Sequence, residues 1–292
     1  MHENLAKTDG PVLVVGAGRA LGLAIVEELR AQGLPAIATM RRRRTDMETR
    51  INAAGAQLRT LDITDSRAFA DLAAESSSLI LLPELPFSVT ALLNAGLPSH
   101  KRCVLFSSHN ASVDFTTPIY DRFRAAEAEL QASPLAWTIL RPTMIYGFPD
   151  DRNISRLVAT FKKLPVVFLP GRGLARQQPV YYRDLAKVAV AVLGADGTCR
   201  QILDIGGPEK LSLKDVYRLA ANGKPVISLP LGPLVWLAKT TASLGLPFPL
   251  STAQLARIGV DRVVRPPDGL PEEHWPKTPL ATVVKKILEN AK

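Results

Sequence analysis

VLVVGAGRALG, residues Val12 to Gly22, decides the fold of this chain: an apolar run ends in a turn with three glycines, and apolar residues at helical spacing begin directly after it. A strand that ends at Val15 and a helix that opens near Arg19 would aim free backbone N–H groups and the positive end of the helix dipole at one point. Gly16, Gly18 and Gly22 can supply positive φ and close approach to a ligand. These features predict a turn that binds the pyrophosphate of a dinucleotide. The alternative is a glycine-rich turn that only packs a helix against a strand.

Short apolar runs alternate with helical patterns or turn residues along the rest of the chain. The runs are PVLVVG, PAIAT, QLRTLD, SLILL, RCVLFSS and AWTILR, with QILDIGG (Gln201–Gly207) returning late. This alternation predicts an α/β fold, a Rossmann-type doubly wound parallel sheet with a small C-terminal lobe. We assign residues 1–145 and 177–207 to an NAD(P)-binding Rossmann domain. Residues 146–176 and 208–292, rich in proline and large apolar side chains, form a smaller substrate or cap lobe.

Composition indicates an ordinary globular protein with a preference for anions. The chain has 292 residues and a net charge of +9, which suits phosphate-bearing ligands and could also attract nucleic acid or membrane surfaces without specificity. We expect no specific nucleic-acid partner. Cys103 and Cys199 are far apart and belong to no C-x-x-C motif, so we expect reduced thiols and no metal site. The N-terminal MHENLAKTDG is too polar for the apolar core of a signal peptide. We therefore expect a cytoplasmic protein.

The second predicted strand ends in a run of arginines. It reads ATMRRRR, with Arg41 directly after the strand and no acidic residue before Asp46. NAD sites usually place Asp or Glu here for the ribose 2′-hydroxyl, whereas NADP sites use an arginine for the 2′-phosphate. The run therefore predicts NADP in preference to NAD, with Arg41 as the main phosphate ligand and Arg19 as the second. The alternative is a solvated basic helix start, which we expect for two or three of the four arginines.

The glycine turn resembles that of the short-chain dehydrogenase/reductase superfamily. GAGRALG matches the G-x-x-x-G-x-G pattern of that superfamily at Gly16 and Gly22, with Ala20 in place of the middle glycine. The G-x-x-G-x-x-G pattern of the extended branch also matches at Gly16 and Gly22, but in that alignment Arg19 takes the position of the middle glycine. In the first alignment Arg19 falls where NADP-preferring members often carry a basic residue. The resemblance implies a set of cofactor-binding residues: Gly16, Gly18, Arg19, Ala20, Leu21 and Gly22.

Segments further along the chain narrow the resemblance to extended and atypical members. RCVLFSSHNAS, IYDRFRAAEAEL, AWTILRPTMIYG, QPVYYRDLAKV and ILDIGGPEKLSLKDV follow one another in the order of that group. The match over about residues 11–260 is most similar to NAD-dependent epimerase/dehydratases, nucleoside-diphosphate-sugar epimerases and the nucleotide-binding accessory subunit of respiratory complex I. It implies that Asp62 lies beside the adenine, although a helix N-cap is the alternative for Asp62. It also implies that Pro142, Thr143 and Met144 pass the nicotinamide.

The catalytic part of the pattern is incomplete. Active members use Y-x-x-x-K, in which the lysine lowers the pKa of the tyrosine, together with a Ser or Thr that polarises the substrate. Tyr120 has the tyrosine's place, but Arg124 stands where the lysine would be. Arginine keeps the positive charge but not the compact ammonium. Ser107 and Ser108 end the fifth strand, and His109, which follows them, is the kind of lone histidine that is more often structural than catalytic.

Two function hypotheses follow, and the sequence leaves open whether the protein is an enzyme. The first is an NADP(H)-dependent oxidoreductase, or an epimerase/dehydratase-like enzyme, that acts on a small molecule with a carbonyl or hydroxyl group. The alternative is a low-turnover NAD(P)-binding sensor or assembly subunit, which Arg124 favours. The apolar segment Leu229–Leu250 contains prolines and glycines that interrupt a spanning helix. It could cover the substrate pocket, form a homodimer contact or lie on a membrane surface.

Overall fold

The computed structural model describes residues 10–148, 151, 153–243 and 258–290 and divides into two compact units. The first unit comprises Met1–Pro142, Tyr182–Ile205 and Arg265–Pro276. The second comprises Thr143–Tyr181, Gly206–Val264 and Lys277–Lys292. The sequence placed all of residues 208–292 in the smaller lobe, whereas the structure groups Arg265–Pro276 with the first unit.

The first unit is built on a seven-stranded sheet in the order β11-β6-β5-β4-β1-β2-β3. All neighbouring strands are parallel. The strands are β1 (Val12–Val15), β2 (Ala36–Met40), β3 (Gln57–Thr60), β4 (Ser78–Leu81), β5 (Arg102–Phe106), β6 (Ala136–Pro142) and β11 (Gln201–Ile205). The strand order reverses between β1 and β4, which is the topological switch point where such sheets bind ligands. The predicted Rossmann-type fold is confirmed, and each of the seven apolar runs forms one of these strands.

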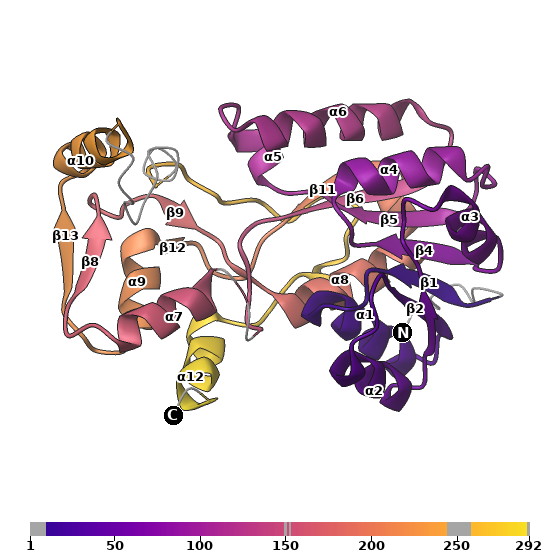
Figure 1. The fold of residues 1–292 in the computed structure, drawn as a ribbon, viewed down its shortest axis with the longest axis horizontal. Coiled ribbons are helices and arrows are strands. Elements are labelled where there is room, and N and C mark those ends of the chain that lie inside the picture. The colour runs from indigo at the N-terminus through magenta and orange to yellow at the C-terminus, as the bar shows by residue number, and fades with distance from the viewer. Residues whose placement is uncertain (1–9, 149–150, 152, 244–257, 291–292) are drawn as a thin grey trace. The chain divides into compact units, whose positions relative to one another are not determined.

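Helices cover both faces of this sheet (Figure 1). The helices of the first unit are α1 (Ala20–Ala31), α2 (Thr45–Ala53), α3 (Ser66–Ala74), α4 (Leu85–Asn94), α5 (Asn110–Val113), α6 (Pro118–Ala132) and α8 (Tyr182–Gly194). Helix α1 packs against α2 and α8, whereas α4 packs against α3 and α6. Because strand side chains alternate, Leu13 and Val15 join Phe69 and Leu85 in one buried core.

The second unit has its own core. In the part of this unit that the structure describes, the strands pair in three short ladders: β7 (Ile145–Tyr146) with β10 (Val180–Tyr181), β9 (Arg176–Gln177) with β12 (Leu211–Ser212), and β8 (Val167–Pro170) with β13 (Val226–Leu229). Its described helices include α7 (Ile154–Lys162), α9 (Leu213–Ala221), α10 (Leu231–Ser243) and α12 (Leu280–Asn290). Tyr146, Val158, Phe161, Val216 and Val283 are buried together. The amphipathic faces of α7, α9 and α12 therefore bury one another.

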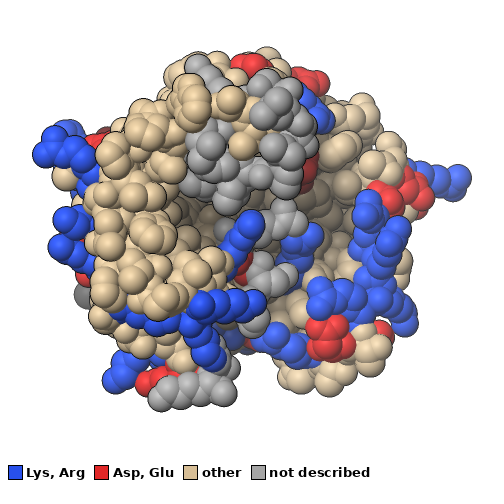
Figure 2. Space-filling model, turned by 60° about the vertical axis from the view of Figure 1, so that its left-hand side comes forward, with Lys and Arg blue, Asp and Glu red and all other residues tan. Residues whose placement is uncertain are grey.

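Surface charge follows the composition. Lysine and arginine side chains outnumber acidic ones on the face drawn in Figure 2. Among the described residues, no helix has the length and apolarity needed to cross a bilayer. Residues 244–250 of the apolar segment Leu229–Leu250 lie outside the described residues.

Candidate functional site

The glycine turn joins β1 to α1 as the sequence predicts. Gly16 has φ +90°, a conformation that favours glycine. Helix α1 begins at Ala20 after Arg19, whose side chain forms no capping hydrogen bond. Ala20, Leu21 and Gly22 are therefore the first residues of a helix, whose amides lack intrahelical acceptors. This arrangement is a general binding site for anions.

Gly22 is required by packing as well as by sequence pattern. A Cβ atom at Gly22 would lie 2.7 Å from the Ala17 Cα and 2.7 Å from the Gly16 carbonyl oxygen. The first turn of α1 thus packs directly on the backbone of the glycine turn, the close approach that the third glycine of such turns provides.

We expect Gly22→Ala to lower the free energy of unfolding by about 1–3 kcal/mol, because the added methyl group overpacks the turn. Urea denaturation measures the change. Gly232→Ala is the matched control, since a Cβ there meets no atom within 4 Å, and we expect no loss of stability from it. Equal stabilities of the two variants would contradict this account of the turn.

A pocket of about 240 Å³ opens beside the turn, at the carboxyl ends of β1 to β4. Gly16, Arg41 and Asp62, three of the residues predicted to bind cofactor, line it together. Leu61 and Phe87 contribute apolar walls. Phe87 is 46% exposed although it is a large apolar side chain, and no motif in the sequence singles it out.

The arginines after β2 differ in their partners. Arg43 lies 3.4 Å from the Glu48 carboxylate and Arg44 lies 2.9 Å from that of Asp46. Arg41 lines the pocket and is exposed. Two of the four arginines therefore have surface ion pairs, in agreement with the solvated role expected for part of this run. Arg44 also reaches back toward the Gly18 carbonyl oxygen at 3.5 Å, a position that the sequence did not predict.

Asp62 does not cap a helix. The cap of α3 is Asp65, whose carboxylate accepts a hydrogen bond from the Ala68 amide. The Asp62 carboxylate accepts hydrogen bonds from the Thr64 amide (3.1 Å) and hydroxyl (2.8 Å). These bonds, with a smaller contribution from the Arg41 guanidinium, lower the pKa of Asp62 below its ordinary value. Asp62 therefore faces the pocket as a carboxylate.

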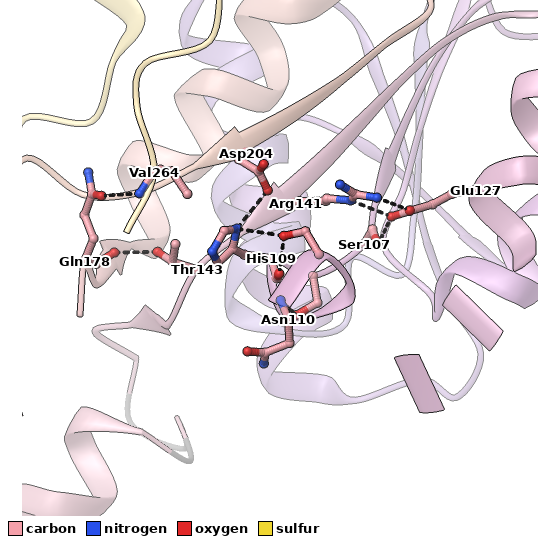
Figure 3. A network of polar contacts seen from close by, with 11 residues as sticks. Ser107, His109, Asn110, Glu127, Arg141, Thr143, Gln178, Asp204 and Val264 are labelled. Carbon is pink, nitrogen blue, oxygen red and sulfur yellow. Dashed lines mark hydrogen bonds and ion pairs between the residues drawn. The ribbon is translucent and has the colours of Figure 1, made fainter. Parts of the chain in front are cut away.

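Ser107, at the end of β5, is already hydrogen-bonded. Its hydroxyl donates to the Glu127 carboxylate of α6 at 2.6 Å. Glu127 is 2% exposed and also accepts two hydrogen bonds from the Arg141 guanidinium of β6. Figure 3 shows the three side chains pointing toward one another. Ser108 instead accepts a hydrogen bond from the Asn110 amide at 3.2 Å.

Tyr120 and Arg124 lie one turn apart on α6 but have separate partners. The Tyr120 hydroxyl accepts a hydrogen bond from the Asn110 side-chain amide at 2.9 Å. The Arg124 guanidinium donates to the carbonyl oxygens of Ala111 (2.8 Å) and Asp114 (3.1 Å) at the end of α5. It also pairs with an aspartate one turn before it on α6. Arg124 thus fastens α5 to α6.

The residues predicted to pass the nicotinamide follow β6. The carbonyl oxygen of Pro142, the last residue of β6, accepts a hydrogen bond from the His109 amide at 3.0 Å. In the second unit, the Thr143 hydroxyl donates to the Gln178 carbonyl oxygen. The Met144 carbonyl accepts from the Val180 amide at 2.9 Å.

No protein-family model matches the chain, but two curated proteins are similar to it. The NAD(P)H azoreductase of Xenophilus azovorans is 28% identical over 225 residues, which cover 74% of this chain and 75% of the relative. The mitochondrial NADH dehydrogenase (ubiquinone) 1 alpha subcomplex subunit 9 of Arabidopsis thaliana is 31% identical over 142 residues. That match covers 45% of this chain and 34% of the relative.

Among solved structures, the Citrobacter sp. triphenylmethane reductase complexed with NADP(H) matches with a TM-score of 0.70 and 18% identity. The match covers 95% of this chain and all of the reductase chain. The fold is that of a Rossmann-type α/β protein with a pocket at the switch point of its sheet. The solved structure shows that the two share a fold, and the chain is similar in sequence to an azoreductase and to a complex I subunit.

Proposed function

We propose that the chain is an NADP(H)-dependent oxidoreductase that reduces a small-molecule acceptor, with an epimerase-like activity as the alternative within the same family. The observation that carries the proposal is the pocket beside the glycine turn, because Gly16, Arg41 and Asp62 line it together. The azoreductase relative and the triphenylmethane reductase fold support reduction as the reaction class.

The residues present fit the dinucleotide. The first amides of α1, together with the helix dipole, suit the pyrophosphate. Arg41 would hold the 2′-phosphate and Asp62 would lie beside the adenine, with Leu61 and Phe87 as apolar walls. Arg19 is proposed as the second ligand of the 2′-phosphate. NADPH, when bound, supplies the hydride; the protein positions it and controls the proton.

Replacing Arg41 by alanine is expected to weaken NADPH binding about tenfold or more, because a hydrogen bond to a charged group contributes about 1.5–3 kcal/mol. NADH binding should hardly change, since NADH lacks the 2′-phosphate. Arg43→Ala is the matched control: it removes the same charge from the same run, but Arg43 is paired with Glu48. Calorimetric titration of both variants with both nucleotides measures the effect. An equal loss of NADPH affinity in the two variants would contradict a specific role for Arg41.

The nicotinamide side of the site would lie at the carboxyl ends of β5 and β6. Pro142, Thr143 and Met144 are proposed to pass the nicotinamide there. Reduction of a neutral acceptor also needs a proton, and the family resemblance makes Tyr120 the candidate donor, with Ser107 or Ser108 as the polarising hydroxyl. Tyr120 and Ser108 suit such roles better than Ser107 does, because the Ser107 hydroxyl already donates to Glu127.

A nucleotide-binding protein without turnover is the second candidate. Two observations favour it: Arg124 is bound to α5 and Ser107 is bound to Glu127. NADPH oxidation measured with azo dyes, quinones, triphenylmethane dyes, aldehydes, ketones and nucleotide sugars separates the two. Oxidation above background with any of them supports the reductase, and nucleotide binding without oxidation supports the alternative. A cytoplasmic location, a homodimer and a membrane-surface contact stay predictions from the sequence.

A further inference from the structure

His109 has an acid–base environment that the family pattern does not contain. It lies directly after β5 and is 6% exposed. Its Nδ1 is 2.9 Å from the Asp204 carboxylate of β11, and its backbone amide is bound to the last carbonyl of β6. Figure 3 shows the imidazole and the Asp204 carboxylate turned toward each other. The Ser112 hydroxyl oxygen lies 3.3 Å from the same Nδ1. Asp204 makes the shorter contact and orients the ring, as a carboxylate orients the histidine in hydrolytic triads.

The other nitrogen of the ring differs in its surroundings. The Nε2 of His109 is shielded from solvent and makes no hydrogen bond with any described residue. A buried polar atom without a partner costs about 1–3 kcal/mol, so native structures rarely keep one without a reason. Because Nδ1 is directed at Asp204, Nε2 is the atom left for exchange with a ligand.

The position of His109 matches where a proton is needed. Ligands of open α/β sheets bind outside the carboxyl ends of the strands, and β5, β6 and β11 all contribute their carboxyl ends to the surroundings of this ring. Arg124, by contrast, is bound to the end of α5. The Tyr120 hydroxyl accepts its hydrogen bond from the neutral side chain of Asn110. His109 thus has the charged partner that Tyr120 lacks.

We propose that His109 is the proton donor of the reaction and that Asp204 is its positioning residue. This inference rests on the proposed reductase function. NADPH gives a hydride to one atom of a neutral acceptor, such as one nitrogen of an azo bond, and is oxidised to NADP+. The Nε2–H bond of the His109 imidazolium breaks, and its proton goes to the other nitrogen, which completes a hydrazo product. After the product leaves, a proton taken up from solvent through the vacated acceptor site restores the imidazolium. Histidine is the side chain most often used for such proton transfers.

The variant that tests the role is His109→Asn. The asparagine amide nitrogen can take the place of Nδ1 and keep the hydrogen bond to Asp204, while Nε2 is deleted. We expect kcat for methyl red and for 2-methyl-1,4-naphthoquinone to fall about 10²–10⁴-fold, the usual contribution of a positioned acid. The Kd for NADPH and the thermal midpoint should stay close to the wild-type values. Asp204→Asn should lower kcat less, with KM for NADPH unchanged.

A second acceptor distinguishes proton donation from a structural role. Crystal violet is a carbocation that takes up a hydride and needs no proton, so its reduction by His109→Asn should stay close to the wild-type rate. Equal losses with crystal violet and with the neutral acceptors would overturn the proton-donor role. Tyr120→Phe is the competing variant: a larger loss of kcat with the neutral acceptors than in His109→Asn would assign the proton to Tyr120 instead.

A readout without turnover comes from long-range 1H–15N NMR of the histidine rings in the cofactor-free protein. We expect the His109 signal, assigned by its absence in His109→Asn, to carry a proton on Nδ1. A proton on Nε2 alone would overturn the proposed pairing with Asp204. If the wild type turns over but His109→Asn keeps its kcat, the role of His109 fails and the reductase stands. If the wild type reduces no acceptor, the proposed function itself fails.

Discussion

Glu127→Ala is expected to lower the free energy of unfolding by about 3–5 kcal/mol, the usual result of removing one partner of a buried ion pair. Glu127 is almost fully buried and accepts hydrogen bonds from Ser107 and from two nitrogens of Arg141. Without the carboxylate, the half-buried Arg141 guanidinium keeps its charge but loses its partner. Urea denaturation of the cofactor-free protein measures the loss.

The double variant Glu127→Leu with Arg141→Met is the control for this prediction. It replaces both charges by apolar side chains, which often restores stability because neither side chain is left unpaired. We expect it to be more stable than Glu127→Ala. A loss below about 1 kcal/mol in Glu127→Ala, the size typical of a surface pair, would contradict the buried network.

Gly18→Val is expected to weaken binding of both NADPH and NADH by about 100-fold or more without unfolding the protein. The middle of such turns must let the backbone approach the pyrophosphate, and losing two charge-assisted hydrogen bonds of about 1.5 kcal/mol each corresponds to about 100-fold. A Cβ at Gly18 lies 3.3 Å from the Met40 sulfur, and that flexible side chain can move aside.

Fluorescence titration with both nucleotides checks the effect of Gly18→Val, and thermal unfolding checks that the fold survives. This variant removes affinity for both nucleotides, whereas Arg41→Ala removes affinity for NADPH alone. Normal binding of NADPH by a folded Gly18→Val protein would mean that the turn only packs α1 against β1.

The fold could be predicted from the sequence because its signals are local. Each strand of the main sheet is a short apolar run. Helix α1 ends at Ala31, and its C-cap Gln32 is followed by Gly33, whose φ of +77° is that of a helix-ending glycine. Parallel strands bring their carboxyl ends to one edge. For that reason Gly16, Arg41 and Asp62, separated in sequence, could be assigned to one site before the structure placed them around one pocket.

The contacts of the proposed catalytic residues could not be predicted in the same way, because the partners of these residues are distant from them in sequence. The contact of His109 with Asp204 joins residues 95 positions apart, so His109 resembled an isolated structural histidine. The bond from Ser107 to Glu127 depends on how α6 packs beside β5. The family pattern directed attention to Tyr120 and Arg124, but it carries no information on the α5 carbonyl groups that bind Arg124.

The most direct test of the account is the ratio of the two cofactor affinities of the wild-type protein, measured by calorimetry at one salt concentration. The account predicts that NADPH binds at least about tenfold more tightly than NADH, because only NADPH carries the 2′-phosphate that Arg41 would hold. Equal affinity for the two nucleotides, or no measurable binding of either, would contradict it.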